Sequence, residues 1–247
     1  MTALLAAELL KVRTVRSTWG YVLAVLGLAA LVTAATIGSE SDQRRSEASF
    51  QGDLLLDGSA PATVVALLLG IVLVTNEFRH GTITPSLLVT PRRNRLLTAK
   101  LLAGAAAGAA LAAIAIAVIA ATAAIWLGIL DVPLELGTAA KAAGRGLVAA
   151  AVAGVLGAAV GGAVHAQVAA LVGALVWIFV AEPLVWVLLG LLDVGGAADY
   201  APTAVLFTIA GTEEDALSFP AAVGMTLVWA AVAAAIAFFR TGRRDIT

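Results

Sequence analysis

The sequence has no cysteine, only two histidines and few charged residues, which make up 13% of its 247 residues. The absence of cysteine excludes disulfide bonds, thiolate zinc sites and cysteine nucleophiles. A soluble domain has about 25% charged and about 45–50% apolar residues, whereas 61% of this chain is hydrophobic and its mean hydropathy is +1.01. We therefore predict an all-α polytopic membrane protein.

Six apolar runs are candidates for helices that cross the roughly 30 Å hydrocarbon core of a bilayer. They cover about residues 19–37, 60–75, 101–130, 142–164, 168–192 and 219–239, so that the whole chain, 1–247, forms a single transmembrane domain. The second run is short for a spanning helix and could begin as early as Leu54. The polar, net acidic residues 38–59 before it are predicted to form an external loop.

Residues 1–18 place Glu8, Lys11 and Arg13 among leucines and valines whose spacing puts most large apolar side chains on one broad helical face. This pattern predicts an interfacial helix lying in the membrane plane, although Glu8 projects near the apolar face. A cytoplasmic extension of the first span is the other interpretation.

Positive charge is unevenly distributed along the chain. Eleven of the fifteen Lys and Arg fall at the amino terminus, between the second and third spans, or at the carboxyl terminus. Because cytoplasmic segments are rich in Lys and Arg, both termini are predicted to be cytoplasmic. The other four, Arg44, Arg45, Lys141 and Arg145, then lie outside the membrane or near its outer surface.

The fifth apolar run contains Glu182 followed by Pro183. Proline removes a backbone donor and disturbs the preceding turn, so two interpretations are open. Either the run is one kinked helix over 168–192, or it crosses only as far as Ala181 and then folds back as an external re-entrant element between the fifth and sixth spans. We favour the second, which requires protein or water around the re-entrant backbone.

Three residues are candidates for a translocation path: Glu182, Trp177 and Trp229. An ionisable group at membrane depth is a functional-site hypothesis, and the two tryptophans, together with Trp186, offer surface to an apolar substrate. The other interpretations are that Glu182 lies at a helix break near the external surface, and that the tryptophans serve packing or interface anchoring.

Glycine pairs four residues apart occur in the third and fourth runs, at Gly104/Gly108 and Gly157/Gly161. They fit the small-residue contacts that membrane helices use. In a chain so rich in Ala and Gly, such pairs are also expected by chance.

The segment 75–100 joins the second and third spans and holds five Lys or Arg against one acid. Gly81 is predicted to end the helix of the second span, residues 82–90 to form a short helix, and Pro91 to begin the next helix. An apolar face on a short cytoplasmic helix needs a partner to cover it, which makes this segment a candidate cytoplasmic coupling helix. Anchoring at lipid headgroups is the other explanation for the arginines.

The same segment carries a recognisable order of motifs, namely Asn76-Glu77-Phe78, Gly81-Thr82-Ile83, Ser86-Leu87, Pro91-Arg92-Arg93 and Ala99-Lys100. This order resembles the type-2 permease family of ATP-binding-cassette (ABC) transporters, and the residues from Glu8 to Trp19 resemble the opening of actinobacterial members. Pro85 departs from the pattern, because it lies within the short helix.

The resemblance implies a dimeric permease, usually an exporter, in the bacterial cell membrane. Its implied partners are a cytoplasmic ATP-binding-cassette ATPase subunit in two copies, a second permease copy or paralogue, and membrane lipids. The residues implied to couple to the ATPase are Glu77, Phe78, Arg79, Gly81, Thr82, Ile83, Ser86, Leu87, Leu88, Pro91, Arg92 and Arg93.

No G-x-x-x-x-G-K-[ST] phosphate loop occurs in the sequence. We therefore expect no ATP site, no enzyme activity and no cofactor on this chain, with ATP and Mg bound by the partner subunit. No nucleic-acid partner is expected.

Two other functions are left open by the sequence. A secondary transporter would show paired broken helices and buried charges, for which Glu182 is a single candidate. A non-transporting membrane sensor or immunity subunit is the second. An intramembrane hydrolase or metal enzyme is disfavoured, since His80 and His165 both lie on the predicted cytoplasmic side and cysteine is absent. The sequence defines no pocket, and so it does not identify a substrate.

Overall fold

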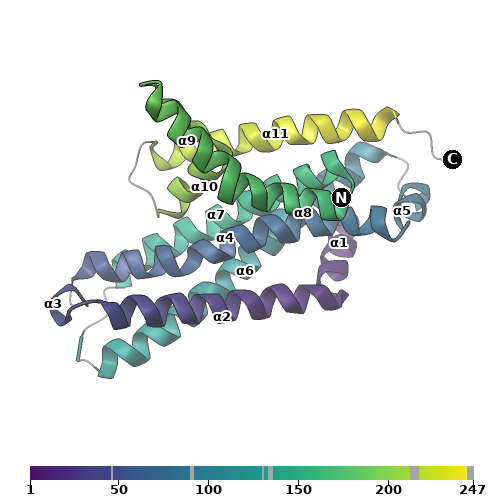
Figure 1. The fold of residues 1–247 in the computed structure, drawn as a ribbon. Coiled ribbons are helices and arrows are strands. Elements are labelled where there is room, and N and C mark those ends of the chain that lie inside the picture. Colours follow the sequence, from purple (N-terminus) through teal and green to yellow (C-terminus); the bar gives the residue numbers. More distant parts are fainter. Residues whose placement is uncertain (46, 90–91, 130, 133–135, 212–216, 244–247) are drawn as a thin grey trace.

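The structure is a computed structural model that describes all residues except 46, 90–91, 130, 133–135, 212–216 and 244–247. In this described part every regular element is a helix (Figure 1), and six helices are long and apolar enough to cross a membrane. The six cover Thr18–Ser39, Ser49–Arg79, Arg93–Ile129, Gly137–Val164, Gln167–Leu191 and Phe219–Arg240. The predicted fold class, an all-α polytopic membrane protein, is confirmed at this level.

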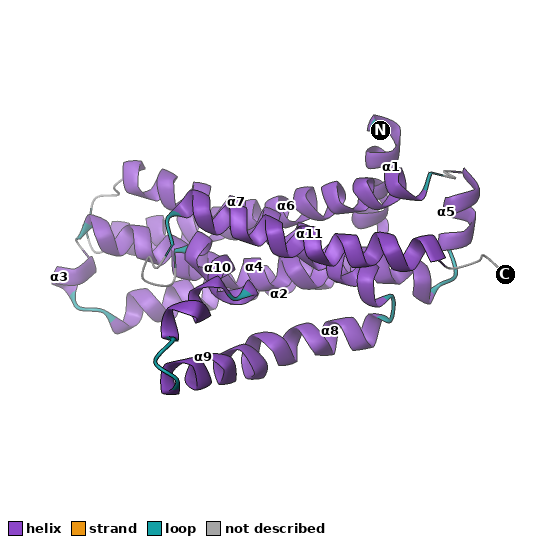
Figure 2. Ribbon diagram, turned by 90° about the horizontal axis from the view of Figure 1, so that it is seen from above, coloured by secondary structure: helices purple, strands orange, loops and turns teal. Residues whose placement is uncertain are grey.

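The helices follow one another in the order α1 (Thr2–Thr14), α2 (Arg16–Ser39), α3 (Asp42–Arg45), α4 (Ala48–Arg79), α5 (Ile83–Val89), α6 (Arg93–Ile129), α7 (Leu136–Val164), α8 (Gln167–Val176), the π-helical turn η1 (Trp177–Ala181), α9 (Glu182–Leu191), the 3-10 helix η2 (Gly195–Tyr200), α10 (Pro202–Ala210) and α11 (Phe219–Arg243). Helices α4, α6 and α7 form the centre of the bundle, with α2 packed on α4 and α6, and α11 packed on α7. Figures 1 and 2 show the long helices running side by side, with α5 at one end of the bundle.

Glycine lets the three central helices approach closely. A Cβ at Gly108 would overlap the carbonyl oxygen of Ala150 on α7, and one at Gly157 would overlap that of Leu67 on α4. A Cβ at Gly104 would lie 2.5 Å from the Gly154 carbonyl oxygen on α7, and one at Gly161 would lie 2.7 Å from the Ile71 carbonyl oxygen on α4. Lipid tails are as apolar as leucine, so membrane helices associate through such close packing rather than through hydrophobic burial. The small-residue contacts predicted for both glycine pairs are confirmed.

The predicted start of the second span is wrong, because α4 begins at Ala48 and includes most of what we assigned to an external loop. Phe50, Leu54 and Leu55 are buried against α2 and α6, whereas Asp53 and Asp57 are exposed. This spacing is that of an amphipathic helix. The loop between α2 and α4 is correspondingly short and holds only the four-residue helix α3. Helix α6 begins at Arg93, close to the helix start predicted at Pro91, whereas α7 begins at Leu136, before the predicted run 142–164.

We favoured an interpretation in which the fifth run crosses only as far as Ala181 and then folds back. The structure shows that the chain does not reverse there. Helix continues from Gln167 to Leu191, and Pro183 follows the π-helical turn η1, which widens the helix just before the proline ring. The chain turns back only after Leu191, where Asp193 has φ +61. The short helix α10 then packs against α7 and α11.

Candidate functional site

The segment between α4 and α6 forms a short helix, as predicted, at one end of the bundle. Helix α4 ends at Arg79, Gly81 takes a left-handed conformation with φ +67, and α5 follows at Ile83. Pro85 is the third residue of α5, where a backbone N–H has no partner within the helix, so proline is tolerated there. The Ser86 hydroxyl donates to the Thr82 carbonyl at 3.0 Å. Pro85, the residue that departs from the pattern of the resembled family, therefore does not interrupt the helix.

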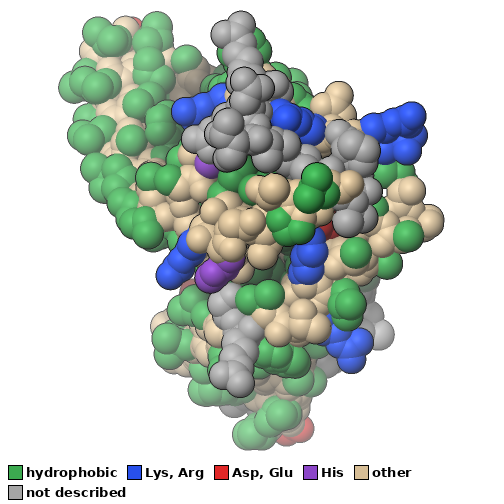
Figure 3. Space-filling model, turned by 90° about the vertical axis from the view of Figure 1, so that its right-hand side faces the viewer, with side chains coloured by type: hydrophobic (Ala, Val, Ile, Leu, Met, Phe, Trp, Pro, Cys, Tyr) green, Lys and Arg blue, Asp and Glu red, His purple; other side chains and the backbone are tan. Residues whose placement is uncertain are grey.

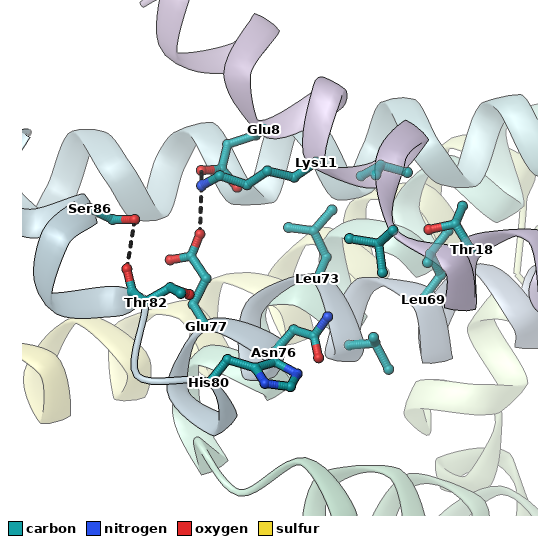
Figure 4. Close-up of a pocket in the computed structure, with 13 residues that line it drawn as sticks. Glu8, Lys11, Thr18, Leu69, Leu73, Asn76, Glu77, His80, Thr82 and Ser86 are labelled. Carbon is teal, nitrogen blue, oxygen red and sulfur yellow. Dashed lines mark hydrogen bonds and ion pairs between the residues drawn. The ribbon is translucent and has the colours of Figure 1, made fainter.

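Four alternating charges lie beside α5 and join three helices, and Figure 4 shows three of them, Glu8, Lys11 and Glu77. The Lys100 ammonium on α6 contacts Glu8 of α1 at 2.9 Å and Glu77 of α4 at 2.7 Å. The Lys11 ammonium on α1 contacts the same two carboxylates at 2.7 and 2.6 Å. Each positive group thus bridges both negative groups. We call Glu8, Lys11, Glu77 and Lys100 the charge cluster.

The charge cluster is neutral and mostly inaccessible to solvent. Lys100 is 2% exposed, Glu8 1% and Glu77 5%, whereas the side chain of Lys11 is 46% exposed. Buried charges persist when they are paired and hydrogen-bonded, and removing one partner leaves an uncompensated charge. The cluster therefore locks the relative positions of α1, α4 and α6.

Lys11 remains protonated at neutral pH. Burial lowers the pKa of its ammonium, but hydrogen bonds and charge interactions with Glu77 and Glu8 outweigh that effect, so the pKa lies above its ordinary value. The stabilisation that follows from this raised pKa is fully present below the unfolded value of about 10.4 and is lost as the pH rises through the folded value.

Three consecutive residues at the end of α4 contact four different partners. Glu77 bonds Lys11 and Lys100, the Phe78 ring lies 4.2 Å from the His165 ring at the α7–α8 turn, and Arg79 donates to Gln167 of α8 at 3.2 Å. The end of α4 that leads into α5 is therefore tied to α1, α6, α8 and the α7–α8 turn.

The remaining residues of the predicted coupling set lie in α5 or in the segments on either side of it. Gly81 and Thr82 are exposed, Ile83 and Ser86 are half-buried, and Leu88 is 79% exposed. Arg92 is exposed just before α6 and Arg93 is the first residue of α6. Pro91 and the side chain of Leu87 lie outside the described residues.

Positive side chains gather at this end of the molecule, as Figure 3 shows. The exposed ones among the described residues are Lys11, Arg13, Arg79, Arg92, Arg95 and Arg240. At the opposite end the exposed charges include Glu47, Asp53, Asp131 and Asp193. We call the end that carries α5 the basic end.

Of the predicted path residues, the two tryptophans share a cavity and Glu182 does not line it. Trp177 and Trp229 lie on a cavity of about 330 Å³ between α4, α7, η1, α10 and α11. The Glu182 carboxylate is buried and accepts bonds from the indole N–H of Trp177 and from the backbone N–H groups of Thr203 and Ala204, at 3.0 and 2.7 Å for the two backbone donors. Its role in the structure is to cap the amino terminus of α10.

Sequence reasoning singled out Glu77 but not its partners. Glu8 appeared as an imperfection in the apolar face of the first helix, and Lys100 as part of a basic segment. Two signals pointed to them: Glu8 and Lys11 are three residues apart on a helix, and Lys100 directly precedes a long apolar run. Because packing buries Lys100, its ammonium needs an acidic partner, and Glu8 and Glu77 supply two.

No protein-family model and no curated protein matches this chain. Among the described residues, no group of three or more His, Asp or Glu side chains could hold a metal ion. A functional conclusion therefore depends on the geometry of α5, the charge cluster and the tryptophan cavity.

Proposed function

We propose that this chain is the membrane-spanning permease subunit of an ATP-driven transporter of the ABC type. It works as a dimer, as an exporter, with separate ATP-hydrolysing subunits that bind ATP and Mg. Both termini and the basic end face the cytoplasm of a bacterial cell, α1 lies in the membrane interface, and α10 is a re-entrant element on the external side.

One observation carries this proposal: a short, exposed helix directly follows the end of α4, and that end is tied to other helices at the basic end. Leu88 on α5 is 79% exposed, and Glu77, Phe78 and Arg79 join the preceding helix to four other parts of the bundle. An ATPase docked on α5 would move the spans, and ATP would bias them through its different affinity for the two states.

The tryptophan cavity supports an apolar substrate. Both indole N–H groups are already occupied, that of Trp177 by Glu182 and that of Trp229 by the Tyr200 carbonyl at 2.9 Å. The cavity therefore presents hydrocarbon and aromatic faces, and favours an uncharged ligand. Because its carboxylate is committed to α10 and Trp177, Glu182 is a poor candidate for the coupling-ion site that a secondary transporter requires.

The test is purification of the tagged chain from its native bacterial cells and detection of a bound phosphate-loop ATPase, with the wild type compared to Leu88→Asp on α5. Leu88 makes little internal contact, so the variant is expected to fold and to bind the ATPase at least about tenfold more weakly, the loss typical of one interface hot spot. The matched control is Ala166→Asp, an exposed residue of the α7–α8 turn at the same end, which should bind normally.

Two results would overturn the proposal. One is that no ATPase binds the wild-type chain. The other is that Leu88→Asp binds the ATPase and supports its ATP turnover as well as Ala166→Asp does. Binding of the ATPase without ATP-dependent transport would instead indicate the non-transporting subunit.

A further inference from the structure

A groove of about 370 Å³ lies between α1, the start of α2, the end of α4 and α5. One part of it is apolar and includes Val15, Leu69 and Leu73, whereas the other part contains Lys11, Glu77 and Ser86. Figure 4 shows the Glu77 carboxylate between α1 and α5. A ligand that fits this groove must have both a polar and an apolar portion.

The polar part of the groove contains a buried acceptor without a donor. Glu77 Oε1 forms ion pairs with the ammonium groups of Lys11 and Lys100. In contrast, Glu77 Oε2 accepts no hydrogen bond from any residue in the described part of the chain. Buried polar atoms are almost always satisfied, because an unsatisfied one costs free energy. A ligand that brings an N–H donor to Oε2 would remove that cost.

Lys11 complements this acceptor with a donor. Its ammonium has three N–H groups, of which the contacts with Glu8 and Glu77 use two, and its side chain is nearly half exposed at the groove. The groove therefore offers a negative oxygen and a positive ammonium close together. A zwitterionic headgroup with an ammonium and a phosphate matches both.

The apolar part of the groove lies on the spans themselves. Leu69 and Leu73 belong to the candidate span Ser49–Arg79, and α1 crosses the end of the bundle beside them (Figure 1). At this position an acyl chain of a membrane lipid can enter from the bilayer, whereas a small soluble amine would leave the apolar part empty.

We propose that the groove binds one phospholipid with a primary ammonium headgroup. Its ammonium donates to Glu77 Oε2, its phosphate lies beside Lys11, and an acyl chain lies along Val15, Leu69 and Leu73. The bound lipid joins α1 to α4 next to α5, at the end of the bundle that the charge cluster holds.

The test compares three lipids on the purified full-length chain in detergent, by native mass spectrometry titration. Phosphatidylethanolamine is expected to bind about tenfold more tightly than phosphatidylcholine, whose quaternary ammonium has no N–H, because one hydrogen bond to a charged group is lost. Phosphatidylglycerol, which has no ammonium, is expected to bind as weakly as phosphatidylcholine. Equal affinity for phosphatidylethanolamine and phosphatidylcholine would overturn the proposal.

A pair of tryptophan variants locates the site. Leu73→Trp fills the apolar part of the groove and should abolish the preference for phosphatidylethanolamine, whereas Leu102→Trp, on an exposed face of α6, should retain it. Both variants leave the charge cluster intact, unlike Glu77→Gln. Wild-type preference in Leu73→Trp would overturn the assignment to this groove. No ATPase is present in the assay, so its result is independent of the proposed transport function.

Discussion

Single charged residues decide how the basic end of this protein is held together. Lys100 is 2% exposed and contacts carboxylates from two other helices, so its charge is compensated only in the folded bundle. Lys11 bonds the same carboxylates but keeps contact with solvent. The two lysines differ in burial rather than in partners.

Removing Lys100 is therefore expected to cost more than removing Lys11. Lys100→Met removes a fully buried partner and should lower the free energy of unfolding by about 3–5 kcal/mol. Lys11→Met should cost less, because the Lys11 side chain is nearly half exposed and water already screens its two ion pairs. The measurement is denaturant unfolding in detergent. Adding Glu8→Gln to Lys100→Met restores neutrality and should recover part of the loss. Equal losses for the two lysines, or no recovery in the double variant, would contradict this account.

At the scale of helices, α10 is held by a charge at each of its ends. The Glu182 carboxylate accepts its first backbone N–H groups, and the Arg145 guanidinium donates to the carbonyls of Thr208 and Ile209 at 2.6 and 3.2 Å. The negative carboxylate lies at the positive end of the helix dipole and the positive guanidinium at its negative end, so both stabilise the helix. A nine-residue helix that would be marginal alone is thereby fixed against the bundle.

Close packing of the central helices leads to a prediction for α6. Gly108→Ala should destabilise the protein by about 1–3 kcal/mol, because the added Cβ meets the Ala150 carbonyl and α7 must move away. Gly128→Ala on the same helix has open space around it and should be neutral or slightly stabilising, since alanine favours helix. Thermal unfolding of the two purified variants compares them directly. A Gly108→Ala variant as stable as Gly128→Ala would show that α6 and α7 do not approach this closely.

Across the whole molecule, charge differs between the two ends of the bundle: most of the exposed Lys and Arg among the described residues lie at the basic end, and exposed acids lie at the other. By the positive-inside rule, this distribution supports the proposed orientation, in which α5 faces the cytoplasm. The chain contains no cysteine, so single introduced cysteines report this orientation without background.

We expect Ser41→Cys and Ala197→Cys to react with a membrane-impermeant maleimide in intact cells, and Asn94→Cys to react only after the membrane is opened. All three residues are exposed, and Asn94 lies on the first turn of α6. The reverse pattern of labelling would place α5 outside and would remove the basis for an ATPase partner.

The sequence by itself determined the number of long apolar helices, the short helix between the second and third of them, and the charge difference between the two ends. These features depend on the hydropathy and charge of residues that are neighbours in the sequence, so counting hydropathy and charge along the chain predicts them. Only the tertiary structure decided which charges pair: Lys11 with Glu77 across 66 positions, Lys100 with Glu8 across 92, and Glu182 with the start of α10. It also extended α4 back to Ala48, because burial of Phe50 and Leu54 against other helices outweighs the polar composition of that stretch. Pairing and burial are non-local, so they depend on how the helices pack rather than on the order of residues along the chain.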